Sequence, residues 1–365
     1  MSDFLNQTEY AQYIGEGEFL LPPDDIHFVY NGRVDFDDKK APVFSYAGSF
    51  VKFRLKASSV KLLIDNRHAY FENYIGVHAG SKSLKYHVDD GINVVDLAAM
   101  VTDEPLDYMI YKRQDASHFY AFLGLIVPKD AMFYDSAPLP LKRMEFFGDS
   151  VTCGEVCEVI ERCGEDDPAG HDGIYSDSYY SYSWMTARKL GACAHLTAQG
   201  GISLLDKEGW YYKPDSYGML TCYDKMEYNP FIVPFKEWDF SRFTPHVVVV
   251  AIGQNDSTPF DYMAEDYDGE HSKYWREQYG LFLATLRKRY KDALIITATT
   301  ILGHHPNWDR AISEVTESMG DVKMHYFKYS HTGCGTKGHI RIPEADLMSD
   351  ELADYIRSFG EEIWR

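Results

Sequence analysis

The chain changes its hydrophobic pattern once, at the proline-bearing segment SAPLPLK over residues 136–142. Before this segment, short runs of aromatic and β-branched residues alternate with turn sequences such as AGS, DDG and DEP. After it, apolar strands alternate with segments of helical period. A change of this kind is typical of two domains of different class, and 365 residues suffice for two. We predict domains at 1–137 and 138–365.

The first domain is predicted to contain only β-structure, because alternating apolar and polar residues indicate half-buried strands and helical periodicity is nearly absent. Several short strands separated by turns at close intervals predict a sandwich or barrel. The predicted strands lie at 27–36, 49–56, 59–65, 69–77, 92–97, 107–113 and 118–127.

The second domain is predicted as α/β with a parallel sheet, because strands and helices alternate along the chain. The segment HVVVVAIG at 246–253 is apolar throughout, as expected of a strand covered on both faces. The other predicted strands lie at 143–150 and 293–300, and the helices at 176–192, 272–290 and 343–359. The helix at 272–290 places one apolar face toward the core, formed by Trp275, Tyr279, Phe282, Leu283, Leu286 and Tyr290.

The charge of the chain bears on its partners. The formal net charge is −20 at pH 7, which argues against nucleic acid and anionic membrane surfaces because both attract basic patches. No run of about 18 apolar residues is present, so no membrane-spanning helix is predicted. The first residues lack a basic start followed by an apolar core, so we expect no secretory signal and a cytoplasmic location.

The six cysteines fit that location as reduced thiols. Cys153, Cys157 and Cys163 cluster, but their spacing contains no CxxC pair and no second ligand pair follows at zinc-finger distance. We therefore predict free thiols, with no metal and no cofactor.

The strongest chemical signal is FFGDSVTCGE at 146–155, where Ser150 ends a buried strand. The carboxyl ends of strands in α/β sheets are where active sites form. A serine hydroxyl needs a nearby base and donors for the developing oxyanion before it attacks an ester. Gly148 permits close backbone approach, and the Ser150 N–H is itself a donor. By itself, the motif favours a structural interpretation, in which the serine caps a helix with Asp149 beside it.

Three further segments follow in order, and together they favour a catalytic serine over a helix cap. GDSVT resembles the first block of the SGNH, or GDSL-type, hydrolase superfamily, and GGISLL at 200–205 resembles the block with an oxyanion glycine. Gly201 fits that position best, and Gly200 is the alternative. AIGQNDS at 251–257 resembles the third block, which implies that the Asn255 amide is another oxyanion donor. GHIRIPEADLMSDELADYI at 338–356 resembles the last block, which implies that His339 is the base.

One position departs from the superfamily pattern. An aspartate usually lies three residues before the histidine, and this sequence has Thr336 there. We therefore expect a Ser150–His339 dyad in which a backbone carbonyl of residues 333–338 orients the imidazole. The Thr336 hydroxyl and a carboxylate from elsewhere in the chain are the alternatives. Asp149 and Asp256 are interpreted as structural, each accepting hydrogen bonds from backbone amides.

The N-terminal half narrows the resemblance. The segments YNGRVDF, APVFSYAGSFVKFRL, SVKLLID and YKRQDASHFYAFLGLIV resemble the jelly-roll domain of family-2 carbohydrate esterases, which precedes an SGNH domain. The resemblance implies an α/β chain with a jelly-roll sandwich before an SGNH-type α/β/α domain. It also implies removal of O-acetyl groups from plant polysaccharides such as xylan and mannan, or from their oligosaccharides. Several members of the family are described as dyads. Another small-acyl esterase or thioesterase and a catalytically silent carbohydrate-binding protein are the alternatives.

Two tryptophans are candidates for packing against a sugar ring. Trp210 follows the predicted oxyanion loop, and Trp308 follows a predicted strand end on the catalytic edge. Trp184 and Trp275 lie on predicted helices and are expected in the core. The insert at 161–177, just beyond Ser150, is a candidate wall of the site.

Overall fold

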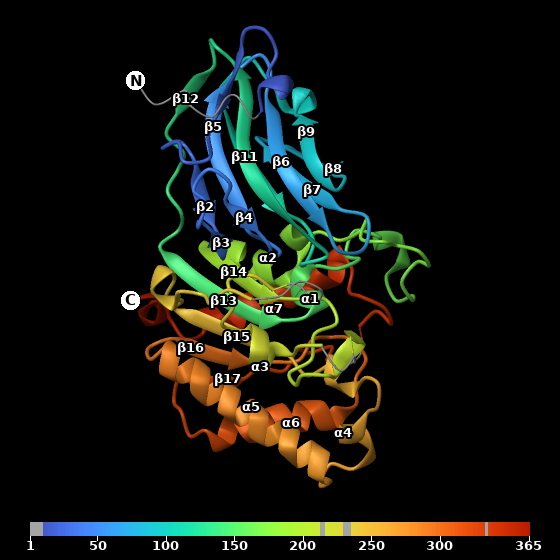
Figure 1. The fold of residues 1–365 in the computed structure, drawn as a ribbon. Helices are drawn as coiled ribbons and strands as arrows, with labels where there is room; N and C mark the ends of the chain where they lie inside the picture. Colours follow the sequence, from blue (N-terminus) through green and yellow to red (C-terminus); the bar gives the residue numbers. More distant parts are fainter. Residues whose placement is uncertain (1–9, 212–215, 229–234, 333–334) are drawn as a thin grey trace.

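The computed structural model describes residues 10–211, 216–228, 235–332 and 335–365. It consists of a β-sandwich at the N-terminal side and a parallel sheet covered by helices at the C-terminal side (Figure 1). The predicted boundary between residues 137 and 138 falls between β12, the last strand of the sandwich, and β13, the first strand of the parallel sheet.

The sandwich consists of two antiparallel sheets with the orders β3-β4-β11-β6-β9 and β12-β5-β10-β7-β8; β1 pairs with β11 and β2 with β5. Side chains alternate along the strands, so one face of each sheet contributes to a shared apolar core that includes Phe53, Ile64, Ile110 and Phe122. The strands are β1 Glu18–Leu21, β2 Val29–Asn31, β3 Val34–Asp35, β4 Val43–Phe44, β5 Phe50–Lys56, β6 Lys61–His68, β7 Tyr74–Ala79, β8 Lys82–His87, β9 Gly91–Asp96, β10 Leu106–Lys112, β11 His118–Pro128 and β12 Met132–Tyr134.

The second sheet is parallel throughout, with the order β14-β13-β15-β16-β17. Its strands are β13 Lys142–Gly148, β14 Ala192–Ala198, β15 Val247–Ala251, β16 Leu294–Thr297 and β17 Met324–Tyr326. The α-helices are α1 Ser150–Cys153, α2 Tyr182–Lys189, α3 Met219–Cys222, α4 Tyr262–Glu265, α5 Glu270–Arg289, α6 Pro306–Ser318 and α7 Ile342–Arg357. Short 3-10 helices lie at Ala11–Tyr13, Ala98–Met100, Ile160–Arg162, Ser178–Tyr180, Gly209–Tyr211, Phe240–Arg242, Asn255–Ser257 and Glu361–Trp364.

Helices cover both faces of this sheet, as the apolar strand sequence predicted. Val247 and Val249 of β15 belong to the core formed with α2 and α7. Val248 and Val250 point the other way, into the core formed with α5 and α6. In Figure 1, α5 and α6 lie on the side of the sheet far from the sandwich. All six side chains predicted for the inner face of α5 and its end are buried.

A buried ion pair joins the two domains. Arg33, in the turn between β2 and β3, donates through Nη2 to Glu145 Oε1 of β13 at 2.8 Å. Both side chains are 1% exposed. Arg33 Nη1 also donates to the carbonyl oxygens of Tyr223 and Lys225, each at 2.7 Å. The sandwich is therefore bonded to the central region of the parallel sheet rather than to its rim.

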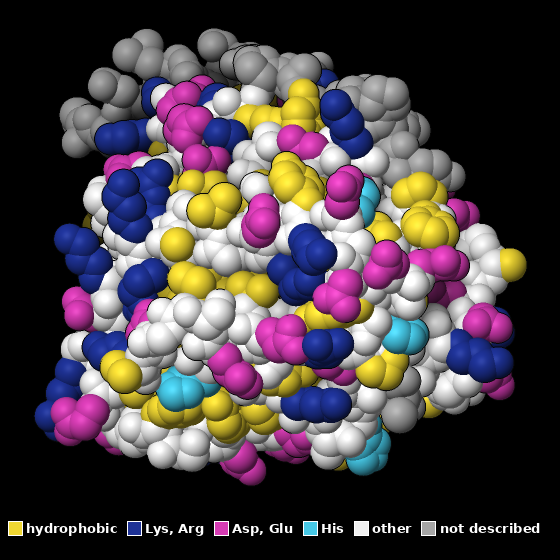
Figure 2. All heavy atoms as spheres, turned by 90° about the horizontal axis from the view of Figure 1, so that it is seen from below, with side chains coloured by type: hydrophobic (Ala, Val, Ile, Leu, Met, Phe, Trp, Pro, Cys, Tyr) yellow, Lys and Arg dark blue, Asp and Glu magenta, His cyan; other side chains and the backbone are white. Residues whose placement is uncertain are grey.

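The described residues contain no helix long and apolar enough to cross a membrane. On the face seen from below in Figure 2, basic and acidic side chains are interspersed, and neither sign gathers into a broad patch. This face of the molecule therefore offers no continuous basic surface of the kind that binds nucleic acid.

The ion pair yields a test of stability. Arg33→Met leaves the Glu145 carboxylate buried without its cation, so we expect the free energy of unfolding to fall by about 3–5 kcal/mol. Arg67→Met is the matched control, because Arg67 pairs with Asp65 at the surface and is 54% exposed, and such pairs contribute about 0–1 kcal/mol. Urea unfolding measures both variants. Equal losses in the two variants would contradict the importance of the buried pair.

Candidate active site

Ser150 lies at the carboxyl end of β13, as the first residue of the short helix α1. Asp149 caps this helix by accepting the Val151 N–H at 3.0 Å. Gly148 has no room for a side chain, because a Cβ there would lie 2.0 Å from Thr152 Oγ1. The prediction that Gly148 permits close approach and that Asp149 is structural is confirmed. The turn is thereby held with the hydroxyl-bearing residue at the edge of the sheet.

Asn255 links the next two blocks to this turn. It begins a 3-10 helix shortly after β15 and is buried. Its Nδ2 donates to the carbonyl of Ile202 at 3.1 Å and lies 3.5 Å from Asp149 Oδ2. Ile202 follows Gly201 directly in the chain. The amide of Asn255 therefore lies between the Ser150 turn and the Gly201 loop.

Asp256 also holds the loop that contains Gly201. Its carboxylate accepts the N–H of Leu204 at 2.9 Å and the indole N–H of Trp275 at 2.8 Å. Burial raises the pKa of Asp256 to about 7. The structural role predicted for this aspartate is confirmed, and it fixes the position of the residues that follow Gly201.

The sandwich also contacts this loop. Asp115, which follows β10, accepts through Oδ2 from the Gly200 N–H at 3.0 Å and from Gln199 Nε2 at 2.5 Å. The hydroxyl of Tyr70 donates to the same oxygen at 3.0 Å. Gly200 therefore uses its N–H to hold the loop, which favours Gly201 over Gly200 as an oxyanion donor.

His339 is oriented by a carboxylate, which corrects the predicted dyad. The Nδ1 of His339 lies 2.7 Å from Asp167 Oδ2, and the His339 N–H donates to Asp167 Oδ1 at 3.0 Å. Arg341 Nη1 donates to the same Oδ1 at 2.8 Å. A Cβ at Gly338 would lie 2.4 Å from that oxygen, so the contact requires glycine there. The expectation that a backbone carbonyl of residues 333–338 accepts the Nδ1–H bond is wrong.

Thr336 has a different role from the one considered for it. Its Oγ1 accepts the Gly164 N–H at 2.9 Å and also bonds to Glu344. It therefore anchors the insert at 161–177 against the start of α7 rather than contacting His339 Nδ1. Residues 333 and 334, part of the segment predicted to supply the carbonyl, lie outside the described residues.

The sequence prediction missed Asp167 because the contact spans 172 positions. One signal pointed toward it: the acidic run Glu165-Asp166-Asp167 lies in the insert just beyond the nucleophile, which was predicted as a wall of the site. The insert does reach the site, since Asp167 bonds to His339.

A second residue missed by the prediction, Glu155, approaches the other side of the imidazole. Its Oε2 lies 3.7 Å from His339 Nε2. No hydrogen bond joins Ser150 Oγ to His339 among the described contacts. Catalytic hydrogen bonds in proteins without substrate are often long, and they tighten when the substrate binds. Glu155 belongs to the same short segment as Ser150, and its N–H donates to the Ser150 carbonyl at 3.0 Å.

The charges around His339 set its protonation. Burial lowers its pKa, but the carboxylates of Glu155, Asp167 and Asp149 outweigh burial, so the net pKa lies above the ordinary value of 6.5. Burial opposes ionisation of Asp167, yet its bonds to His339 and Arg341 hold its pKa well below the usual range. Burial raises the pKa of Glu155 to about 7 and that of Asp149 to about 6. Asp167 is therefore the permanently ionised partner of the imidazole.

The two tryptophan candidates differ in exposure. Trp308 is fully buried on α6, where its Nε1 donates to Asp261 Oδ1 at 3.0 Å, so the predicted role in substrate binding is wrong. It turns inward because it lies on the apolar face of an amphipathic helix, where its ring packs against Trp275 and Tyr262. Trp210 is 69% exposed, and its N–H donates to the Gly201 carbonyl at 3.1 Å. Trp184 and Trp275 are in the core as predicted.

Among the residues that the structure describes, no three His, Cys, Asp or Glu side chains form a metal-ligand group. The absence of a metal and of a cofactor stays a prediction. The clustered residues Cys153, Cys157 and Cys163 are free thiols, as predicted.

Comparison with known proteins gives matches over nearly the whole chain. Residues 30–136 match the family model described as carbohydrate esterase 2 N-terminal. The chain is 28% identical over 351 residues to the cellulase/esterase CelE of Acetivibrio thermocellus, covering 92% of this chain but only 40% of that protein. It is 23% identical to an acetylxylan esterase / glucomannan deacetylase of Cellvibrio japonicus, covering 98% of this chain and 95% of that one.

The fold is matched as well. A family two carbohydrate esterase from Clostridium thermocellum, solved in complex with cellohexaose, is 25% identical and superposes with a TM-score of 0.75. This match covers 91% of the present chain and 98% of the other. These matches show that the chain resembles the family-2 carbohydrate esterases over nearly its whole length, in sequence and in fold, as the sequence motifs predicted.

Proposed function

We propose that this chain is a serine carboxylic ester hydrolase that removes acetyl groups from carbohydrates, with Ser150, His339 and Asp167 acting as a triad. The observation that carries the proposal is the His339 imidazole, which Asp167 holds at Nδ1 from a distance of 2.7 Å. That bond places the proton on Nδ1 and leaves Nε2 free to accept another.

The first half of the reaction forms an acetyl-enzyme. Ser150 Oγ attacks the acetyl carbonyl carbon while His339 Nε2 accepts the hydroxyl proton. The positive charge that develops on the imidazole is stabilised by the ionised Asp167. The tetrahedral intermediate then collapses, and His339 returns the proton to the departing sugar hydroxyl. In the second half, water attacks the acetyl-enzyme by the same route and releases acetate.

Three donors are assigned to the oxyanion: the N–H of Ser150, the N–H of Gly201 and the Nδ2 of Asn255. They come from the carboxyl ends of β13, β14 and β15. The position of the Asn255 amide supports the assignment, because one N–H donates to the Ile202 carbonyl beside the Gly201 loop while the other makes only a long contact of 3.5 Å with Asp149 Oδ2. Such donors act most strongly where charge develops away from water.

The carbohydrate part of the proposal is supported by the relatives, whose names describe activity on xylan and glucomannan acetyl groups and, for one structure, a complex with cellohexaose. Trp210 offers an exposed aromatic face beside the Gly201 loop, against which a pyranose ring would pack. The jelly-roll topology of the sandwich and the domain boundary at 137/138 belong to the same proposal. The cytoplasmic location and the exclusion of nucleic acid and membrane as partners stay predictions from the sequence.

The function is tested by acetate release. Acetylated xylan and glucomannan oligosaccharides should lose acetyl groups, followed by NMR, and p-nitrophenyl acetate should be preferred to the octanoyl ester. Ser150→Ala and His339→Ala should each lower activity by roughly a thousandfold or more. Because the two side chains act as a unit, the double variant should be scarcely worse than either single one.

Three outcomes would refute this proposal: glycan binding without any acetate release, a preference for long acyl chains, or strictly additive losses in the double variant. Activity should also survive exhaustive EDTA treatment, since the oxyanion donors replace a Lewis acid.

The triad is tested at Asp167. Asp167→Asn keeps the size of the side chain but disturbs the tautomer and removes the charge that stabilises the imidazolium. We expect kcat to fall by roughly a thousandfold to ten-thousandfold. Asp166→Asn is the control, because it removes the same charge from the neighbouring exposed position. An Asp167→Asn enzyme that is folded and retains activity within about tenfold, or roughly 1.4 kcal/mol of barrier, would restore the dyad.

The pH dependence follows from the charges at His339. Only the neutral imidazole accepts the Ser150 proton, so kcat/KM should fall as the pH drops through the pKa of His339. That pKa is raised, so the midpoint of the acid limb should lie above 6.5. Glu155→Gln removes the carboxylate that contributes most to raising it, and the limb should move to lower pH. Glu161→Gln, at an exposed position, should leave the limb in place; an unmoved limb in Glu155→Gln would refute the assignment.

A further inference from the structure

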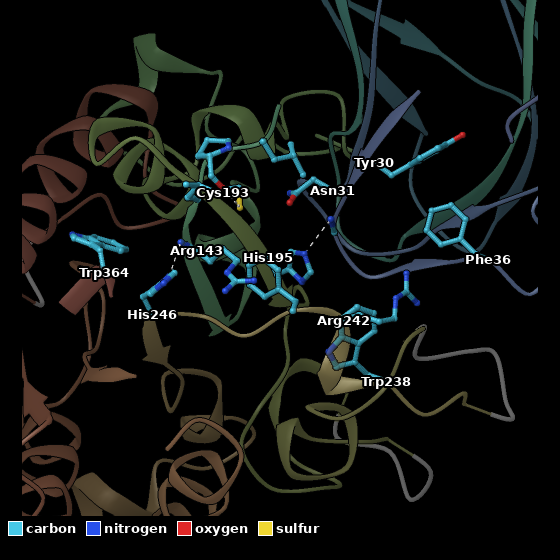
Figure 3. Close-up of a pocket in the computed structure, with 15 residues that line it drawn as sticks. Tyr30, Asn31, Phe36, Arg143, Cys193, His195, Trp238, Arg242, His246 and Trp364 are labelled. Carbon is cyan, nitrogen blue, oxygen red and sulfur yellow. Dashed lines mark hydrogen bonds between the residues drawn. The ribbon is translucent and has the colours of Figure 1, made fainter. Parts of the chain in front are cut away.

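A cavity lies between the two domains at the amino ends of the parallel strands. It has a volume of about 550 Å³, within the range of small-molecule sites. Figure 3 shows His195 and Arg143 near its centre, with Tyr30 and Phe36 on the side of the sandwich and Trp364 on the opposite side. The walls come from the sandwich, the interdomain linker, the starts of β13 and β14, the segment before β15 and the C-terminal 3-10 helix.

This cavity is separate from the candidate active site. Strand β13 passes from Arg143 at the cavity to Gly148 before Ser150, and these six residues of extended chain span roughly 17 Å. The cavity and the Ser150 turn therefore lie at opposite edges of one sheet. A molecule bound at one edge does not occupy the other.

The charged side chains that line the cavity are basic, whereas the chain as a whole is acidic. Acidic residues outnumber basic ones by 56 to 36 overall, yet the lining contains Arg143 and Arg242 and no Asp or Glu. Neither arginine forms an ion pair with another described residue. Asp35 and Asp239 are the carboxylates that act on Arg242, and Asp35 is already paired with Lys236. Arg242 Nη2 donates to the Val34 carbonyl at 2.8 Å and Nη1 lies 3.6 Å from Met226 Sδ, so its guanidinium is partly engaged, and Arg143 is the main cation available to an anion.

Three nitrogen atoms in the lining are buried and have no hydrogen-bond partner within the described part of the chain: His195 Nδ1, Trp238 Nε1 and Arg143 Nε. His195 is 4% and Trp238 5% exposed. The Gly32 N–H donates to His195 Nε2 at 3.2 Å, so the hydrogen of the neutral ring lies on Nδ1. All three nitrogens are therefore donors that lack an acceptor, and buried donors of this kind are rare in folded proteins.

The two histidines in the lining, His195 and His246, are neutral hydrogen-bond donors rather than cations near neutral pH. Burial together with Arg33 and Arg242 holds the pKa of His195 well below its usual value. Burial and Arg143 likewise lower the pKa of His246, whose Nδ1 accepts the Arg143 N–H at 3.1 Å. Near neutral pH the two arginines supply the positive charge, and the imidazoles supply uncharged N–H groups.

Aromatic rings form the remaining walls. The Arg242 guanidinium lies 4.7 Å from the ring centre of Trp238 and 5.4 Å from that of Phe36. The rings of His195 and Phe243 stack with their centres 3.6 Å apart. Flat apolar faces beside cationic forks suit a ligand that combines a ring with a negative group, whereas a bare inorganic anion leaves most of this volume unfilled.

We propose that this cavity is a binding site for a small anion carried on a sugar-sized ring, a uronate or a sugar phosphate, with Arg143 and Arg242 on the anionic group and Trp238 beside the ring. The planar guanidinium of Arg143 offers a fork of N–H groups that matches the two oxygens of a carboxylate or phosphate.

Isothermal titration calorimetry on the full chain tests the proposal with D-glucuronate, glucose 6-phosphate, D-glucose and inorganic phosphate. One or both ring anions should bind at least about tenfold tighter than glucose and than phosphate alone. Binding of glucuronate alone identifies a carboxylate ligand, and binding of glucose 6-phosphate alone a phosphate ligand. Equal binding of glucose, equal binding of inorganic phosphate, or no binding at millimolar concentration would overturn the proposal.

Variants locate the site. Arg143→Met and Trp238→Phe should each weaken binding of the ring anion by about tenfold or more, while ester hydrolysis stays unchanged because the cavity lies at the opposite edge of the sheet. Trp238→Phe keeps an aromatic ring and removes only the N–H and part of the face, so it remains informative if Arg143→Met does not fold. Arg310→Met, which removes the same charge from the surface of α6, should bind normally. Unaltered binding in both cavity variants would place the ligand elsewhere and refute the site.

Discussion

The guanidinium of Arg33 and the carboxylate of Glu145 are both withdrawn from solvent, and each depends on the other for its charge to be compatible with burial. The pair is completed by bonds to the Tyr223 and Lys225 carbonyls on one side and by the Thr197 hydroxyl at 3.0 Å from Glu145 on the other. Without this pairing, desolvation would oppose docking of the sandwich on the sheet. The relative position of the two domains, and everything built at their seam, follows from it.

Two features at the seam depend on that position. At the carboxyl edge of the sheet, Asp115 of the sandwich bonds to the Gly200 N–H and so holds the loop that carries Gly201. At the amino edge, the Gly32 N–H of the sandwich bonds to His195 of β14, beside the cationic cavity. A sandwich that merely covered the sheet would provide neither contact, because both require register to within a hydrogen-bond length.

The sequence predicted those parts of the fold and of the site that depend on local hydrophobic pattern and on short motifs. The apolar run of β15 and the amphipathic face of α5 follow from periodicity, and Ser150, Asn255 and their neighbours lie in blocks whose order places them on one edge. Asp167 and Glu155 could not be found in this way, because their roles arise from contacts with His339 across most of the catalytic domain. The substrate role predicted for Trp308 from its position after a strand end is wrong, because the sequence analysis did not predict α6, whose inner face carries this residue.

His339 lies between two carboxylates whose environments shift their pKa values in opposite directions. Asp167 is held ionised by Arg341 and by the imidazole itself, so it keeps the Nδ1–H bond through the reaction. Glu155 is half-buried without such a cation, and its pKa of about 7 makes it uncharged in part at neutral pH. An ionised group at Nε2 would hold the proton on the imidazole and oppose its role as a base. Burial of Glu155 weakens that opposition, which leaves Nε2 able to serve Ser150 while Asp167 alone fixes the ring.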